Sequence, residues 1–189
     1  MSRRSSPPAF PVGLAPASAA DSRCPAGPGA PILGIVITAP PLSHRAILAF
    51  DLPAIRRIEA ASFPSAWSRR LLVQILSRPD TEGEVVLQGV RVRGFYVTAR
   101  LAHHTHVLNL AVDRSTRRQG LASYALRRVE RRARSRGHRF IELEVRETNL
   151  AAQLLYRKAG YRAIEIKRGY YGDEDGYLMR LLLDGGPAG

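Results

Sequence analysis

A short basic turn lies between a segment with the pattern of a strand and a segment with the pattern of a helix. Residues 108–112 are strand-like, and helical spacing of apolar residues begins soon after Gly120. The first N–H groups of a helix have no carbonyl partner, and together with the helix dipole they attract anions. Gly120 would let a phosphate approach the backbone, and Arg117 and Arg118 would add charge-assisted hydrogen bonds. The sequence therefore predicts an anion site, with an ordinary strand-to-helix turn as the alternative.

Charged and apolar residues alternate in the strand-like segment 140–146. The charged positions are Glu142, Glu144 and Arg146, and the apolar residues between them share the opposite face. Interior strands of a sheet covered on both faces are usually apolar throughout, so a charged face indicates that the sheet opens onto a cleft. A carboxylate in such a cleft can act as a general base. An edge strand with one solvated face is the alternative interpretation.

The segment that follows has the pattern of a helix that begins after Asn149 and is closed by Gly160. Asn149 is a favourable N-cap residue. Tyr156 lies beside the apolar stripe of this helix, where ordinary packing accounts for a tyrosine without any chemistry.

Three histidines, His103, His104 and His106, lie close together in the sequence. No cysteine, aspartate or glutamate stands at a spacing that would complete a metal site with them, so we expect no bound metal.

Arginines are concentrated in the predicted helix after Gly120. A solvated helix face is the simplest interpretation of this run, and a stripe that contacts RNA is the alternative. The run contains Arg127, Arg128, Arg131, Arg132, Arg134 and Arg136.

The elements that must position these residues follow from hydrophobic periodicity and from helix start and stop signals. Helices are expected after Asp51, Ser68, Gly120 and Asn149. Strands are expected over residues 45–50, 84–88, 92–100, 105–112, 140–145, 161–167 and 177–183. The predicted order β-α-α-β-β-β-α-β-α-β-β corresponds to an α/β fold, a mixed sheet flanked by helices.

Composition divides the 189 residues into two parts. Of the first 41 residues, 26 are Pro, Ala, Ser or Gly, so we expect a disordered tail over residues 1–43 and a folded domain over residues 44–189. No run of about 18 apolar residues exists, which argues against a membrane span. The single cysteine, Cys24, excludes a disulfide framework, and we expect a soluble, cytoplasmic protein.

The net charge of +13 fits an anionic partner such as RNA, a ribosome or a phosphorylated cofactor. A general bias toward arginine, which outnumbers lysine 27 to 2, is the alternative explanation of that charge.

Four segments together resemble one family. Residues 108–112, 117–122, 143–146 and 149–161 are similar, in order and spacing, to the motifs of the GNAT superfamily of acetyl-CoA-dependent N-acetyltransferases. The resemblance covers residues 45–183 and is strongest to the group that acetylates the N-terminal alanine of a ribosomal protein. Residues 51–68 and 167–171 also fit that group.

The resemblance implies a GNAT-like fold, acetyl-CoA as co-substrate and specific roles for residues. Glu144 would act as the base and Tyr156 as the acid. The cofactor-binding positions would be Leu110, Ala111 and Val112 for the pantetheine arm, Arg117, Arg118, Gln119, Gly120, Leu121, Ala122 and Ser123 for the pyrophosphate, and Asn149. Ala122 replaces the more common second glycine, and the loop after Tyr171, which helps to shape the peptide pocket in this family, is short.

The expected acceptor is the N-terminus of a ribosomal protein or of another protein, with RNA contact not required and no membrane involved. A GNAT enzyme that acetylates a small amine, an antibiotic or a lysine side chain is the main alternative. A basic RNA- or ribosome-binding module without catalysis is a further alternative, against which the presence of both Glu144 and Tyr156 in register argues.

Overall fold

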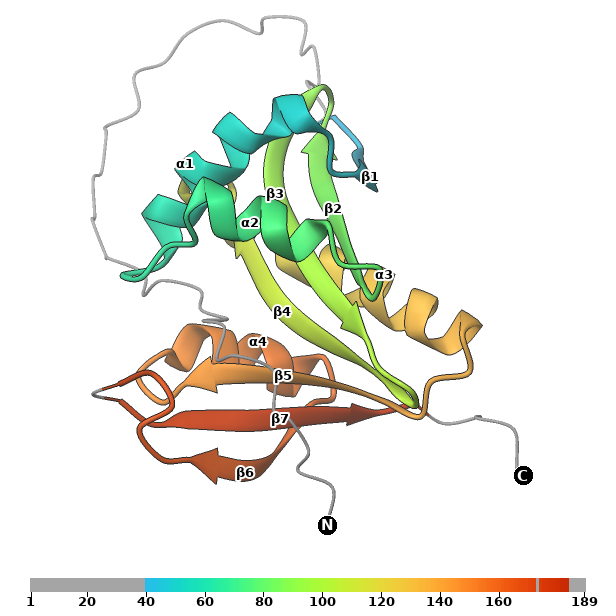
Figure 1. Ribbon diagram of the computed structural model, residues 1–189, viewed down its shortest axis with the longest axis vertical. Coiled ribbons are helices and arrows are strands. Elements are labelled where there is room, and N and C mark those ends of the chain that lie inside the picture. Colours follow the sequence, from blue (N-terminus) through green and yellow to red (C-terminus); the bar gives the residue numbers. More distant parts are fainter. Residues whose placement is uncertain (1–39, 173, 184–189) are drawn as a thin grey trace, which may run out of the picture.

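The computed structural model describes residues 40–172 and 174–183, which form one seven-stranded sheet with helices on both faces (Figure 1). The strands are β1 (Leu42–Ala46), β2 (Thr81–Gln88), β3 (Arg91–Arg100), β4 (His104–Val112), β5 (Phe140–Arg146), β6 (Arg162–Lys167) and β7 (Gly176–Leu182). The helices are α1 (Leu52–Ser62), α2 (Arg69–Leu76), α3 (Leu121–Ser135) and α4 (Leu150–Lys158), with short 3-10 turns η1 (Ala49–Asp51) and η2 (Arg114–Thr116). The predicted order of helices and strands is confirmed.

The chain differs from the prediction at its first strand. We expected a strand over residues 45–50, but β1 ends at Ala46 and a 3-10 turn follows. The cause is Asp51, whose carboxylate accepts hydrogen bonds from the Leu48 N–H at 2.8 Å and from the Arg45 guanidinium at 2.6 and 2.8 Å. β1 also begins at Leu42, two residues inside the predicted tail, whose residues 1–39, with Cys24, lie outside the described residues.

Two hydrophobic clusters hold the layers together. One cluster packs α1 and α2 against the face of the sheet that carries Val85, Phe95 and Leu108. The other packs α3 and α4 against the opposite face, around Leu110 and Leu143. In Figure 1, α1 and α2 lie in front of β2, β3 and β4, while α3 lies behind them. Each helix buries one apolar stripe, as its periodicity predicts.

The middle of the sheet contains its one parallel pair of neighbours within the described residues, β4 and β5. The two strands pair from His104 and Phe140 as far as Val107 and Leu143, and then they diverge (Figure 1). A register shift between β3 and β4 leaves Leu108 as an extra residue at this point. Because β5 lies between β4 and β7, the alternative that it is a solvated edge strand is wrong.

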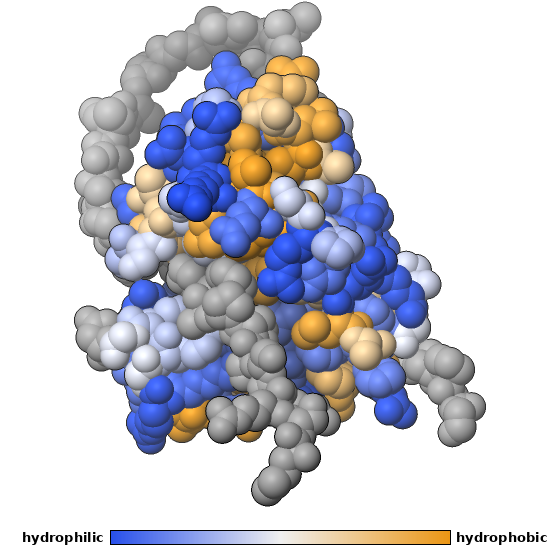
Figure 2. Space-filling model, in the orientation of Figure 1, coloured by the Kyte–Doolittle hydropathy of each residue, from blue (hydrophilic) through white to orange (hydrophobic). Residues whose placement is uncertain are grey.

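The face of the molecule in Figure 2 is mainly hydrophilic, and hydrophobic residues gather at the top, where Figure 1 places the start of α1. Among the residues that the structure describes, no helix has the length and apolar character needed to cross a membrane.

Candidate active site

The turn after β4 leads directly into the N-terminus of α3. Gly120 is the N-cap residue, with a φ of 82°, and no side chain caps the helix. Arg118 also has a positive φ, 61°. A Cβ added at Gly120 would meet no atom within 4 Å apart from its chain neighbours, so the space beside Gly120, at the start of α3, is open. This geometry suits a phosphate group, because the backbone can approach an anion without a side chain in the way.

The two arginines of this turn have different surroundings. Arg118 is exposed, as is Gln119. The Arg117 guanidinium is half-buried and donates a hydrogen bond to the Ser62 hydroxyl of α1 at 3.4 Å. Burial and the neighbouring Arg114 lower the pKa of Arg117 from its ordinary value. Arg117 therefore connects the turn to α1, whereas Arg118 is accessible to an anion.

The second half of β4 has one unpaired edge. Leu110, Ala111 and Val112 pair with Tyr96, Phe95 and Gly94 of β3 on one side. On the other side, the pairing with β5 has already ended at Val107. The backbone N–H and C=O groups on that edge of β4 are available to an extended molecule that enters between the diverging strands.

Glu144 of β5 is 3% exposed and is held by two donors. Its Oε2 lies 2.7 Å from Nε2 of His106 on β4, and its Oε1 accepts a hydrogen bond from Nζ of Lys167 on β6 at 2.5 Å. Burial alone would raise the pKa of the Glu144 carboxyl, but the bonds and charges of His106 and Lys167 outweigh it and hold the pKa below its ordinary value. Glu144 is thus a charged carboxylate beside the point where β4 and β5 separate.

A second polar group lies next to Glu144 on the same face. The Glu142 carboxylate accepts two hydrogen bonds from Arg180 of β7, at 2.6 and 2.9 Å, and its other oxygen is 3.4 Å from Nε2 of His104. The nearest ligand atoms of His104, His106 and Glu142 all lie within 4.8 Å of one another. The sequence offered no carboxylate near the histidines, because Glu142 comes from the parallel strand 36 to 38 positions later. The expectation of no metal stays a prediction.

Tyr156 of α4 is fully buried, and its hydroxyl has no hydrogen-bond partner among the described residues. Burial raises the pKa of Tyr156, so the phenol keeps its proton across the neutral range. A buried polar group without a hydrogen bond costs free energy, so the Tyr156 hydroxyl is a donor that a ligand could use. At the start of the same helix, Asn149 is confirmed as the N-cap, because its Oδ1 accepts a hydrogen bond from the Ala152 N–H at 3.2 Å.

Glu59 of α1 is a buried carboxyl that the sequence did not single out. It accepts hydrogen bonds from the Trp67 N–H at 3.0 Å and from the Asn109 amide at 3.1 and 3.2 Å. Burial raises the pKa of Glu59 to about 7, although both donors act in the opposite direction. The Glu59 carboxyl thus links α1 to the segment before α2 through Trp67, and to β4 through Asn109, the residue before Leu110.

The sequence did not reveal the contacts of Glu144 with His106 and Lys167. His104 and His106 share one face of β4, and Glu142 and Glu144 share one face of β5. Knowing that β4 and β5 are parallel neighbours in this register would have placed the two histidines beside the two glutamates. No local signal connects Lys167 with Glu144, because β7 separates their strands in the sheet.

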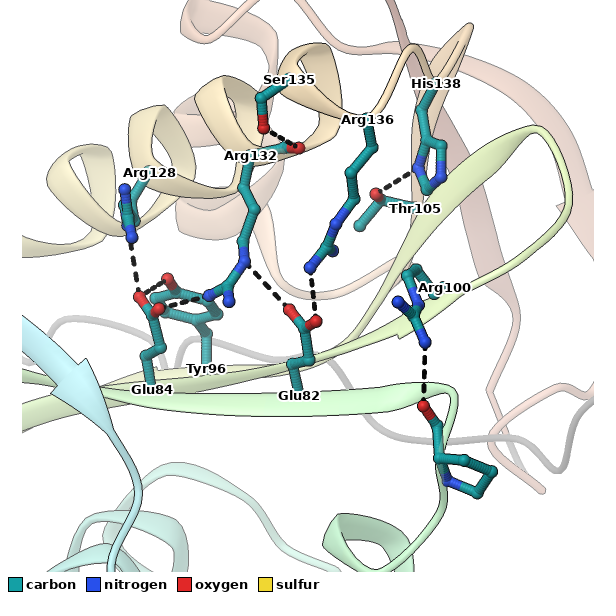
Figure 3. A network of polar contacts seen from close by, with 11 residues as sticks. Glu82, Glu84, Tyr96, Arg100, Thr105, Arg128, Arg132, Ser135, Arg136 and His138 are labelled. Atoms are coloured by element: carbon teal, nitrogen blue, oxygen red, sulfur yellow. Dashed lines mark hydrogen bonds and ion pairs between the residues drawn. The ribbon is translucent and has the colours of Figure 1, made fainter.

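The arginine run of α3 is not simply a solvated face. Figure 3 shows Arg128, Arg132 and Arg136 extending from α3 toward Glu82 and Glu84 of β2. Arg128 and Arg132 bind Glu84, and Arg132 and Arg136 bind Glu82. Half of the run therefore fastens the helix to the sheet, while Arg127, Arg131 and Arg134 are exposed.

Comparisons with known proteins agree on one family. The model of the acetyltransferase (GNAT) family matches residues 52–161. A [ribosomal protein bS18]-alanine N-acetyltransferase of Escherichia coli strain K12 is 31% identical over 142 residues, covering 70% of this chain and 92% of the relative. The crystal structure of the ribosomal-protein-S18-alanine N-acetyltransferase from Escherichia coli superposes with a TM-score of 0.70 at 27% identity, covering 76% of this chain and 96% of that one. A GNAT family acetyltransferase from Elizabethkingia anophelis, solved with acetyl-CoA bound, shares the fold, with a TM-score of 0.63 at 19% identity, 75% of this chain and 98% of that one.

Proposed function

The chain belongs to the acetyltransferase (GNAT) family and is an acyltransferase, and from this premise we propose that it transfers the acetyl group of acetyl-CoA to the N-terminal amine of a protein. The proposed acceptor is the N-terminal alanine of a small-subunit ribosomal protein, and the name of the Escherichia coli relative gives an alanine of ribosomal protein bS18 as its substrate. The proposed catalytic unit is the domain expected over residues 44–189, extended to the start of β1 at Leu42, in the cytoplasm.

The observation that carries the proposal is the divergence of β4 and β5 beyond the Val107–Leu143 pair. Three further features support it: the edge of β4 at residues 110–112 that no described strand pairs, the open space at Gly120 before α3, and the Tyr156 hydroxyl without a described partner. A thioester with a long arm and a diphosphate needs an extended hydrogen-bonding edge, an anion site and a donor near the sulfur. The edge of β4 would supply the hydrogen-bonding edge, the start of α3 the anion site, and Tyr156 of α4 the donor.

The acceptor side of the proposed reaction centres on Glu144. An N-terminal ammonium has an ordinary pKa of about 7.7–8.0, so its proton leaves with modest help near neutrality. The Glu144 carboxylate attracts the ammonium and takes the proton directly or through water. The nitrogen then attacks the thioester carbon, the N–C bond forms and the C–S bond breaks.

The donor side centres on backbone groups and Tyr156. N–H groups on the free edge of β4 stabilise the oxyanion, and the exposed Arg118 and the first N–H groups of α3 hold the diphosphate. The Tyr156 hydroxyl donates its hydrogen bond, and then its proton, to the departing sulfur. The raised pKa of Tyr156 keeps the phenol protonated in the resting enzyme, so its hydroxyl is available as a hydrogen-bond donor.

Acetylation of synthetic peptides tests the proposal. The chain is incubated with acetyl-CoA and a peptide that begins Ala-Arg, and the product is located by fragmentation mass spectrometry. The matched control is a version of this peptide that has a blocked N-terminus and an internal lysine. Polyamines and an aminoglycoside are tested alongside it. We expect acetyl on the free N-terminus and none on the blocked peptide. Acetylation of the lysine or of the small amines alone would contradict the proposal.

A further inference from the structure

The fold brings together two histidines and a carboxylate that lie on different strands. The ligand atoms of His104, His106 and Glu142 are within 4.8 Å of one another, and residues 40–172 and 174–183 contain no other such group of three. Nε2 of His104 is 3.4 Å from Oε2 of Glu142, close to the separation of two ligands on one tetrahedral ion. Two imidazoles and a carboxylate suit zinc, cobalt, nickel or copper, whereas Mg²⁺ and Ca²⁺ prefer oxygen ligands alone. The group is therefore of the type that selects a transition metal.

Two of the three side chains are oriented by contacts outside the group. Nε2 of His106 lies 2.7 Å from Oε2 of Glu144. Arg180 binds Oε1 of Glu142, and Oε2 is the oxygen that faces His104. Ligands at metal sites are commonly oriented by such outer contacts, in which an imidazole meets a carboxylate and a ligating carboxylate accepts a further hydrogen bond.

An ion can reach this group from solvent. The His104 side chain is 20% exposed, while the side chains of His106 and Glu142 are 8% and 11% exposed. The His104 ring stacks on Phe140, with the ring centroids 4.5 Å apart, which restricts its orientation. The guanidinium of Arg180 lies beside Glu142 and opposes a second cation. We therefore expect reversible binding of an ion from solution and not a permanent structural metal.

We propose that His104, His106 and Glu142 bind a transition-metal dication such as Zn²⁺, and that the bound ion inhibits acetyl transfer. An ion on His106 affects Glu144 whichever ring nitrogen it uses. Through Nε2 it replaces the hydrogen bond to Glu144, and through Nδ1 it adds two positive charges on the other side of the ring. In both cases the Glu144 carboxylate attracts a substrate ammonium less strongly.

The sequence alone favours no metal, because the carboxylate becomes a neighbour of the histidines only when β4 pairs with β5. The inhibition rests on the proposed function, since it acts through Glu144. The binding of the ion does not, and it is measured separately.

Equilibrium dialysis of the full chain against Zn²⁺ measures the binding directly. All proteins carry Cys24→Ser, which removes the single thiol of the chain, because a thiolate is itself a zinc ligand. We expect one Zn²⁺ per parent chain and an affinity at least about tenfold lower in His104→Gln, which lacks one ligand. The matched control His103→Gln removes an exposed neighbouring histidine outside the group and should bind Zn²⁺ as the parent does. Equal affinity in His104→Gln and the parent would overturn the site.

A second measurement needs no variant of the ligands. NMR of ring-labelled histidine in the parent chain follows the five imidazoles as Zn²⁺ is added. We expect the ring signals of His104 and His106 to shift together up to one equivalent, while the ring signal of His103 stays unchanged. A shift of the His103 ring without a shift of the His106 ring would overturn the proposed ligand set.

Inhibition is measured as kcat/KM on the peptide that begins with alanine, at free Zn²⁺ concentrations fixed by a metal buffer. The buffer is needed because the thiol of released CoA also binds zinc. We expect the Zn²⁺ concentration that halves the activity to be at least about tenfold higher for His104→Gln than for the parent and for His103→Gln. Equal inhibition of His104→Gln and the parent would overturn the inhibitory role. Absence of acetyl transfer to every free N-terminus without Zn²⁺, with zinc binding intact in dialysis, would instead overturn the proposed function.

Discussion

Glu84 of β2 and Glu144 of β5 are two buried glutamates with nearly equal exposure, 5% and 3%. Each is bound by a hydrogen-bonding ring side chain and by at least one cation, and each has a pKa below its ordinary value despite burial. Glu84 accepts hydrogen bonds from the Tyr96 hydroxyl and from Arg128 and Arg132 of α3 (Figure 3). Glu144 accepts them from His106 and Lys167 on the opposite face of the sheet.

The difference between the two glutamates lies in their partners and their place in the sheet. Arginine stays charged at every physiological pH, so the contacts of Glu84 are constant and fasten α3 to β2. Glu144 is bound by an imidazole and an ammonium from two other strands, and it lies where β4 and β5 separate. Burial and a lowered pKa are common to both sites. A place beside the point where β4 and β5 separate is what distinguishes the carboxylate to which we assign chemistry.

Glu84→Gln should have the largest effect on stability. Loss of the charge leaves Arg128 without its counter-ion and Arg132 with Glu82 alone, which lowers the free energy of unfolding by about 3 kcal/mol, the lower end for a buried pair because both arginines are partly exposed. Urea unfolding measures this loss, and kcat per folded molecule should stay within about twofold. The control Glu130→Gln alters the partly exposed i,i+4 pair with Arg134 and should cost less than about 0.5 kcal/mol. A large loss of kcat in Glu84→Gln would remove the distinction between the two glutamates.

A third buried glutamate, Glu59, extends the comparison, because its described hydrogen-bond partners are amides and not cations. Its pKa is raised from 4.5 to about 7, so the folded state holds the proton more tightly than the unfolded state between those values. Stability from this group is therefore present in acid and is lost as pH rises through 4.5 to 7, by about 2 to 3 kcal/mol. Urea unfolding at pH 5 and pH 8 should show this fall in the wild type but not in Glu59→Gln. An equal fall in both proteins would contradict the raised pKa.

Tyr156→Phe should lower kcat about 100-fold with little change in the affinity for acetyl-CoA, because proton delivery to the sulfur alone is lost. Tyr161 supplies a matched control. Its hydroxyl is also buried without a described partner, and its ring centroid lies 5.9 Å from that of Tyr156. Steady-state kinetics of Tyr161→Phe should match the wild type. Equal rates in the wild type and Tyr156→Phe would reduce Tyr156 to a packing residue.

Gly120→Val should weaken acetyl-CoA binding about tenfold, or about 1.4 kcal/mol, since a side chain would enter the open space before α3. A positive φ makes this substitution strained as well. Gly137→Val at the other end of α3 is a control with the same liability, because its φ is 68° and it too has open space around it. Calorimetric titration should show weaker binding for Gly120→Val alone. Unchanged affinity in a folded Gly120→Val protein would contradict the assigned phosphate site.

The order of elements and the faces of the strands were predictable from the sequence, because periodicity and caps such as Ser68 and Asn149 act locally. The partners of Glu144 were not, since they come from two other strands brought together by the sheet order. The same reason applies to the arginine run of α3. Half of these arginines bind glutamates of β2, and a helical pattern in the sequence does not reveal such contacts. Motif spacing predicts which residues stand near the reaction, and long-range pairing determines the surroundings of their charges.

The central claim is that Glu144 removes a proton from the substrate amine, and the pH dependence of Glu144→Gln tests it most directly. kcat/KM on a peptide that begins with alanine is measured for the wild type and the variant from about pH 6 to 9.5, a range that brackets the ordinary pKa of the amine. Above about pH 8 most of the amine is already neutral, so the base has less to contribute. We therefore expect the ratio of wild-type to variant activity to be largest near pH 6 and to shrink as pH rises. A constant ratio across this range would mean that Glu144 orients the substrate and removes no proton.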